Sequence, residues 1–129
     1  MRYISYNGSK KGVCMFQIEF YETKDGQRPI EEFLDSLDDK MTAKLVGLME
    51  ILEEYGNNLR MPYSKHLEDG IFELRCKQGS GIVRILYFFY YEGKIIITNG
   101  FVKKTQKTPR QEIETAKQRR DDWISREGR

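Results

Sequence analysis

The sequence is poor in the residues that build metal sites and disulfide frameworks. Its 129 residues include one histidine, His66, and two cysteines, Cys14 and Cys76. Because no pair of these residues has the spacing of metal ligands, we expect neither a bound metal nor another cofactor. Two cysteines without a disulfide framework suit a reducing compartment, so we expect the protein to be cytoplasmic.

Long apolar runs are also missing. The longest, Ile85 to Tyr91, is far shorter than the roughly 20 residues that a membrane-spanning helix needs, and we expect no membrane partner. The first fourteen residues are polar and lack the apolar segment of a secretory signal. We expect residues 1–14 to be a disordered extension and residues 15–129 to form a single domain.

Charge of both signs is plentiful but unevenly divided along the chain. The net charge is +2, yet residues 60–110 hold ten Lys and Arg against four acids, and residues 15–59 hold four against eleven. Clustered cations repel one another unless something negative lies among them, so the basic segment indicates a polyanionic partner. The alternative is a charged, solvated face without a partner.

Hydrophobic periodicity predicts an α+β fold that begins with a strand. Phe16, Ile18 and Phe20 recur at every second position, which is the period of a half-buried strand. Apolar residues at helical spacing then predict two amphipathic helices, over residues 29–37 and 41–55. We expect these helices to cover one face of the sheet, with their acidic side chains in solvent.

After a loop over residues 61–70, the pattern predicts an antiparallel meander and a helix. The three strands of the meander cover Ile71 to Lys77, Ile82 to Tyr91 and Ile95 to Val102. Thr108 has the character of an N-cap and Pro109 of a first helical residue, so a C-terminal helix follows. The expected architecture is a small, mostly antiparallel sheet, made of the N-terminal strand and the meander, with two N-terminal helices packed on it and a C-terminal helix.

Two arginines of the meander are expected to lie side by side. A turn centred near Gly79 and Ser80 sets Arg84 opposite Arg75, or one pair away on the same face, and alternation places Arg75 on the less buried face. An arginine in a central strand is costly unless it is paired. Either a salt bridge from Glu73 or another acid compensates for the pair, or the two guanidinium groups form an anion site.

The surrounding residues favour a site that handles phosphate. Lys65 and His66 precede the strands, and a lysine cluster follows the last one at residues 103–107. RNA cleavage without a metal requires a base that takes the proton of the 2′-hydroxyl, and cations that stabilise the charged phosphoryl oxygens. His66 is the natural candidate for that base because the pKa of histidine lies near neutrality.

Three stretches of the sequence resemble one known family: FYETKDGQRPIEEFLDSL, LRMPYSKHLEDGIFELR and VRILYFFYYEGKIIITNGFVKKTQKTPRQEIETA. They are similar to the phage-derived Gp49-like, HigB-type toxins of the RelE/ParE superfamily, from Met15 to about Asp122. The resemblance implies a RelE-like fold, with helices on one face of the sheet and mRNA on the other. It also implies a ribosome-dependent endoribonuclease that inhibits translation, and an antitoxin, a helix-turn-helix protein, encoded nearby.

The resemblance also maps functional roles onto residues of this sequence. Arg75, Arg84, Lys103 and Lys104 match the positions of the superfamily's basic residues, and the tyrosine that some relatives carry after the last strand is missing from KTPRQ here. His66 or a lysine is therefore expected to act as the base. We expect catalysis from Arg75, Arg84, His66 and Lys104, and RNA contacts from Lys65, Lys77, Lys103, Lys107 and Arg110.

Other functions remain compatible with the same resemblance. ParE-like members share the fold but inhibit DNA gyrase and cut nothing, so the fold alone assigns no activity. One alternative is therefore a non-catalytic interaction protein, either similar to a gyrase inhibitor or an inactive toxin that only binds its antitoxin. A plain nucleic-acid-binding module is the third reading.

Overall fold

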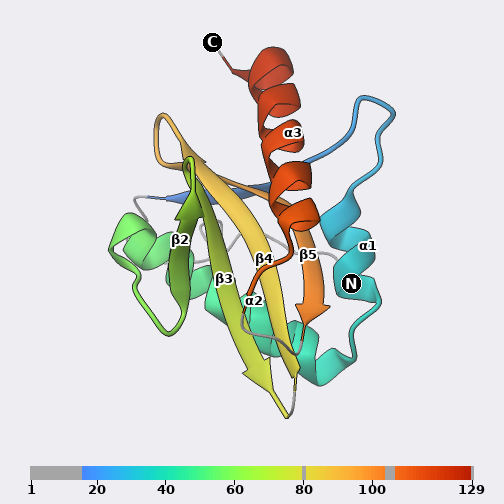
Figure 1. Cartoon of the computed structure of the whole chain (residues 1–129), viewed down its shortest axis with the longest axis vertical. Helices are drawn as coiled ribbons and strands as arrows, with labels where there is room; N and C mark the ends of the chain where they lie inside the picture. The colour runs from blue at the N-terminus through green and yellow to red at the C-terminus, as the bar shows by residue number, and fades with distance from the viewer. Residues whose placement is uncertain (1–15, 80, 104–106, 129) are drawn as a thin grey trace.

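The protein folds around a five-stranded sheet with helices on both faces (Figure 1). The computed structural model describes residues 16–79, 81–103 and 107–128, so the expected extension over residues 1–14 lies outside the described residues. The strand order is β1-β5-β4-β3-β2, where only β1 and β5 pair in parallel. The strands are β1 (Gln17–Phe20), β2 (Ser64–Glu68), β3 (Ile71–Gln78), β4 (Gly81–Tyr90) and β5 (Lys94–Lys103). The predicted α+β class and the mostly antiparallel sheet are confirmed.

The strand β2 corrects the expectation of a loop over residues 61–70. It pairs antiparallel with β3, with Ser64 opposite Leu74 and Lys65 opposite Glu73, and a register shift interrupts the pairing between His66 and Glu68. An edge strand is bonded on one side only and carries polar residues, so it lacks the apolar alternation that marks a central strand. The sheet therefore has one strand more than the sequence predicts.

Two helices, α1 (Pro29–Asp35) and α2 (Asp39–Tyr55), cover one face of the sheet, as predicted. The Asp38 side chain caps α2 by accepting a hydrogen bond of 2.7 Å from the backbone N–H of Met41. A short 3₁₀ helix, η2 (Gly56–Asn58), follows. Fully buried side chains from both layers form the core on this face, among them Ile30, Leu45, Met49, Leu52, Leu74, Ile85 and Ile97.

One acidic residue of α2 contradicts the expectation that the acids of these helices lie in solvent. Glu53 is fully buried, and its Oε2 accepts a hydrogen bond of 2.9 Å from the backbone N–H of Ile18. Ile18 belongs to β1, which is an edge strand among the strands that the structure describes. The carboxylate therefore takes the place of a missing strand, because a buried backbone N–H needs an acceptor.

The C-terminal helix α3 (Arg110–Glu127) covers the other face, which the sequence predicts to be less buried. Figure 1 shows α3 on the near side of the sheet and α2 on the far side. Ala116 and Trp123 of α3 pack against a second apolar cluster, made of Tyr21, Ile71, Leu86, Phe88 and Ile96. The helix α3 thus partly covers the sheet face that carries Arg75, and Ile71 and Glu73 are buried on that face.

An irregularity in β5 fastens α3 to the sheet. The register with β4 shifts by one residue, so that Leu86 faces Asn99 and Tyr87 faces Ile97. The Asn99 side chain donates a hydrogen bond of 2.9 Å to Glu112 Oε1, and Arg119 donates one of 2.9 Å to the carbonyl oxygen of Thr98.

None of the helices in the described ranges is both long and apolar enough to cross a bilayer.

Candidate active site

Arg75 and Arg84 stand directly opposite each other on neighbouring strands. Arg75 of β3 pairs with Arg84 of β4, which confirms the register predicted from the turn between them. Their surroundings differ, because the side chain of Arg84 is fully buried and that of Arg75 is 14% exposed. The two arginines are therefore adjacent, but only one of them reaches the surface.

The buried carboxylate of Glu73 compensates for both arginines. Its Oε2 lies 3.2 Å from Nε of Arg75, and its Oε1 lies 3.6 Å from Nη1 of Arg84. Glu73 precedes Arg75 by two positions on β3, so alternation puts both side chains on the same face. The salt bridge that the sequence offers as one explanation of the pair is present, and it serves both partners.

Thr108 completes this buried cluster instead of capping α3. Its hydroxyl donates a hydrogen bond to Glu73 Oε1 and accepts one of 3.3 Å from Nη1 of Arg84. The N-cap of α3 is Pro109, without a side-chain cap, which corrects the predicted role of Thr108. A buried carboxylate attracts a nearby hydroxyl, because each unmade hydrogen bond of a buried charge is costly. The start of α3 is thereby tied to the middle of the sheet.

A hollow of about 550 Å³ lies over this cluster, between β2, β3 and the start of α3. We call it the basic pocket. It gathers four of the residues expected at the site, with Glu73 and Thr108 in its wall. The four are Lys65, Arg75, Lys107 and Arg110.

The structure does not bring the other expected residues into the basic pocket. His66 follows Lys65 on β2 and pairs with Phe72, on the opposite face of the sheet; its ring lies 4.9 Å from that of Phe72. Arg84 is buried behind Glu73, and Lys77 is exposed at the far end of β3. Lys103 ends β5 opposite Ile82, and Lys104 lies outside the described residues.

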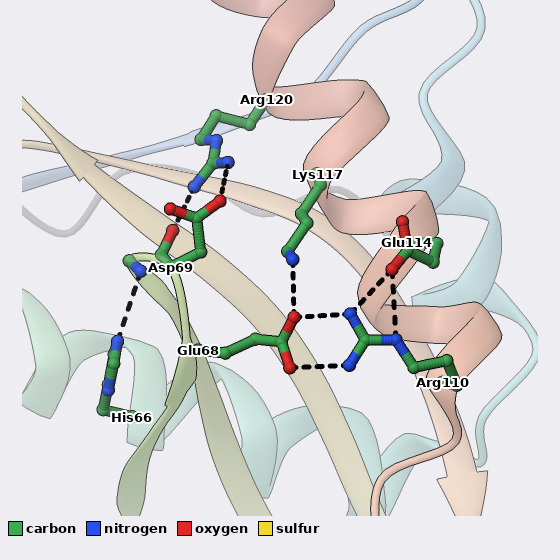
Figure 2. A network of polar contacts seen from close by, with 8 residues as sticks. His66, Glu68, Asp69, Arg110, Glu114, Lys117 and Arg120 are labelled. Carbon is green, nitrogen blue, oxygen red and sulfur yellow. Dashed lines mark hydrogen bonds and ion pairs between the residues drawn. The ribbon is translucent and has the colours of Figure 1, made fainter.

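An ion-pair network forms the outer wall of the basic pocket (Figure 2). Glu68 of β2 accepts hydrogen bonds from Arg110 and Lys117 of α3, and Arg110 also donates one of 2.7 Å to Glu114. These bonds, first that of Arg110 and then that of Lys117, lower the pKa of Glu68 to about 2. Arg110 is therefore held by two carboxylates, although the sequence presents it as an RNA contact.

A second part of the network lies at the tip of the β2–β3 hairpin. Arg120 of α3 donates a hydrogen bond of 2.9 Å to Asp69, and this contact lowers the pKa of Asp69. His66 accepts a hydrogen bond of 3.2 Å at Nε2 from the backbone N–H of Gly70, on the other side of the same tip (Figure 2). Three side chains of α3 thus hold the hairpin beside the basic pocket.

Comparison with known proteins assigns the family. A family model for phage-derived Gp49-like proteins matches residues 32–121, which include Glu73, both strand arginines and the whole lining of the basic pocket. The chain belongs to the phage-derived Gp49-like family. Two proteins of Mycobacterium tuberculosis, from the strains CDC 1551 / Oshkosh and ATCC 25618 / H37Rv, are each named probable endoribonuclease HigB1. Each is 31% identical to the Gp49-like chain over 104 residues, covering 81% of this chain and 81% of the relative. The resemblance to HigB-type toxins is confirmed.

Sequence reasoning named Glu73 as a salt-bridge partner and Thr108 as a helix cap, but it placed neither among the functional residues of this Gp49-like site. Glu73 had a visible signal, because it is the acid two positions before Arg75 on the same strand. Thr108 had none, because its hydroxyl meets Glu73 across 35 residues of sequence. Among the described residues, no group of three His, Cys, Asp or Glu side chains is arranged to hold a metal ion.

Proposed function

We propose that this Gp49-like protein is the toxin of a type II toxin-antitoxin system, a cytoplasmic endoribonuclease that cleaves mRNA on the ribosome without a metal ion. The observation that carries the proposal is the basic pocket, where Lys65, Arg75, Lys107 and Arg110 converge above a buried Arg–Glu–Thr cluster. The curated relatives named probable endoribonucleases support the reaction class. The partner is an antitoxin, a helix-turn-helix protein encoded nearby.

The proposed reaction is an internal transfer of the phosphate. A base takes the proton of the 2′-hydroxyl, and the 2′-oxygen attacks the adjacent phosphorus. The bond to the 5′-oxygen breaks and that oxygen takes up a proton, which leaves a 2′,3′-cyclic phosphate and a 5′-hydroxyl. Cations around the phosphate stabilise the charge that builds up on its oxygens, as preorganised donors do in other active sites.

Within this mechanism, Arg75 is the cation that contacts the phosphate. It lines the basic pocket, whereas Arg84 is fully buried and contacts Glu73 and Thr108. We assign the base to a lysine of the pocket, Lys65 or Lys107, because His66 lies on the other face of the sheet. The sequence leaves His66 and a lysine open as the base, and the lining of the basic pocket favours a lysine.

The proposal is tested by incubating the purified chain with mRNA, with and without ribosomes, and mapping the ends of the products. The wild-type protein should cut only when ribosomes are present, leaving 5′-hydroxyl ends. Arg75→Ala should slow cleavage by about a hundredfold or more, since removal of one charge-stabilising donor costs about that much. His66→Ala, on the opposite face, serves as the matched control and should cut at nearly the wild-type rate. Products with 5′-phosphate ends, or no cleavage by a folded chain, would overturn the proposal.

A non-catalytic protein of the same fold, which binds gyrase or only its antitoxin, is the second candidate. The specific observation in its favour is that Glu73 already forms an ion pair with each of the two strand arginines. Induced expression distinguishes the two candidates. Growth arrest with cut mRNA supports the first candidate. Growth arrest with intact mRNA and inhibited gyrase, or no growth arrest at all, supports the second.

A further inference from the structure

A second hollow, of about 450 Å³, lies on the other side of the sheet, between α2 and the end of β3. We call it the α2 groove. Its lining includes Lys44, Gly47 and Ile51 of α2, Tyr63 before β2, and Cys76 and Lys77 of β3. Arg75 also lines it, and the proposed mechanism uses none of the groove's other lining residues.

Large apolar side chains are exposed along the α2 groove. Ile51 is 41% exposed and Tyr63 is 51% exposed. Tyr55, one turn further along α2 than Ile51, is 51% exposed as well. Neighbouring apolar side chains left in water are typical of a surface that binds a partner.

Gly47 gives independent support, because the fold itself does not need a glycine there. It lies in the interior of α2, where glycine destabilises a helix relative to alanine. A Cβ atom added at Gly47 would meet no atom within 4 Å, so no intramolecular contact requires its absence. The missing side chain instead leaves the surface of the groove open and lets a partner approach the helix closely.

The charged end of the α2 groove indicates the chemistry of that partner. The pairing of β2 with β3 ends where the N–H of Arg75 donates to the carbonyl oxygen of Tyr63. Beyond that point the carbonyl oxygen of Lys77 accepts a hydrogen bond of 2.7 Å from Nζ of Lys44. Lys44 and Lys77 thus line this end of the groove, beside an apolar floor. An extended or helical peptide segment with apolar side chains and a carboxylate complements this surface.

We propose that the α2 groove binds a segment of the antitoxin, with apolar side chains over Gly47 and Ile51 and a carboxylate at Lys44 and Lys77. The inference rests on the proposed function, which supplies the antitoxin. RNA fits less well, since the floor is apolar. Residues 1–14 of this chain hold three bases and no acid, so they are repelled by the lysines. Arg75 lines both the groove and the basic pocket, so a bound segment lies next to the proposed phosphate-binding arginine.

The test measures the affinity of the full chain for the antitoxin, taken as the product of the adjacent reading frame, by calorimetry. Gly47→Leu fills the groove and should weaken binding by about tenfold or more, whereas Gly47→Ala should weaken it less and raise the melting temperature. Ala43→Leu adds the same side chain at an exposed position of α2 outside the groove, and it should bind as the wild type does.

Cleavage of mRNA by the same proteins separates this proposal from the proposed function. Gly47→Leu should still cut mRNA, and co-expressed antitoxin should no longer rescue growth. If Gly47→Leu binds the antitoxin as tightly as the wild type, the proposed groove site is wrong, but the proposed function stands. The same conclusion follows if Gly47→Leu loses affinity for RNA and keeps its affinity for the antitoxin. A wild-type chain that does not bind the antitoxin at all overturns both the groove and the antitoxin partner.

Discussion

At the residue scale, Glu73 determines what the two strand arginines can do. It lies between them and holds both, and Thr108 shares its Oε1 with Arg84. Arg84 is thereby enclosed in a buried ion pair, whose components are costly to separate. Arg75 keeps an exposed edge in the basic pocket, which is the property that a phosphate contact requires.

These different roles predict that two similar substitutions affect stability and cleavage to different degrees. Arg84→Ala leaves Glu73 buried with a single cationic partner, so it should reduce the free energy of unfolding by about 3–5 kcal/mol. Arg75→Ala should cost less than half as much, because Arg84 and Thr108 still compensate for the carboxylate, and its main effect should be on cleavage. Urea unfolding of both proteins measures the difference, with Lys24→Ala, in an exposed turn, as the control. Equal losses of stability in the two variants would contradict these separate roles of Arg75 and Arg84.

At the scale of elements, α3 and the β2–β3 hairpin enclose the basic pocket together. The buried contacts of Ala116 and Trp123 hold α3 on the sheet, and the ion pairs of Arg110, Lys117 and Arg120 attach the hairpin to it. The ion pairs are at least partly exposed to solvent, so salt weakens them more than it weakens the apolar contacts. The wall of the pocket therefore depends on ionised carboxylates at Glu68 and Asp69.

The depressed pKa of Glu68 predicts how this attachment responds to acid. The folded pKa is about 2, below the ordinary value of 4.5, so the ionised carboxylate favours the folded state. Its contribution to stability is complete above about pH 4.5 and is lost as the pH falls toward 2. Urea unfolding at several pH values should show wild type more stable than Glu68→Gln near neutrality, with the difference disappearing in acid. A difference that persists at pH 2 would show that the ion pairs do not cause it.

At the scale of the whole molecule, the sheet separates two proposed binding surfaces. The basic pocket lies on the face that α3 partly covers, and the α2 groove lies on the side of α2. The separation agrees with the charge division along the chain, since the acidic segment 15–59 contributes α1 and α2. The cations of residues 60–110 line the surface where we propose that RNA binds.

This arrangement predicts a specific salt dependence of RNA binding. Replacing Lys65 and Lys107 by Ala removes two exposed cations of the basic pocket, so it should weaken binding to single-stranded RNA. The slope of log K against log salt should fall in magnitude by about 1 to 2, since each lost phosphate contact contributes somewhat less than one. Lys40→Ala, exposed on α2, is the matched control. An unchanged slope would remove the two lysines from the RNA-binding surface.

Much of the fold follows from patterns that are local in the sequence. The helical spacing of apolar residues located α1 and α2. The turn predicted near Gly79 was enough to place Arg84 opposite Arg75 or one pair away, because the turn of a short hairpin fixes its register, and the structure has the two directly opposite. The class of the fold and the adjacency of the two arginines were therefore predictable.

The sequence by itself determined the three α-helices, the strands other than β2 and the arginine pair, whereas only the tertiary structure decided which residues meet in the basic pocket. The polar strand β2 carries no apolar alternation, so its existence, and with it the opposite faces of Lys65 and His66, depends on pairing with β3. Glu73 meets Thr108 across 35 residues, and Glu68 meets Arg110 across 42. Such contacts form when α3 folds back onto the sheet, where burial and charge pairing outweigh local preference.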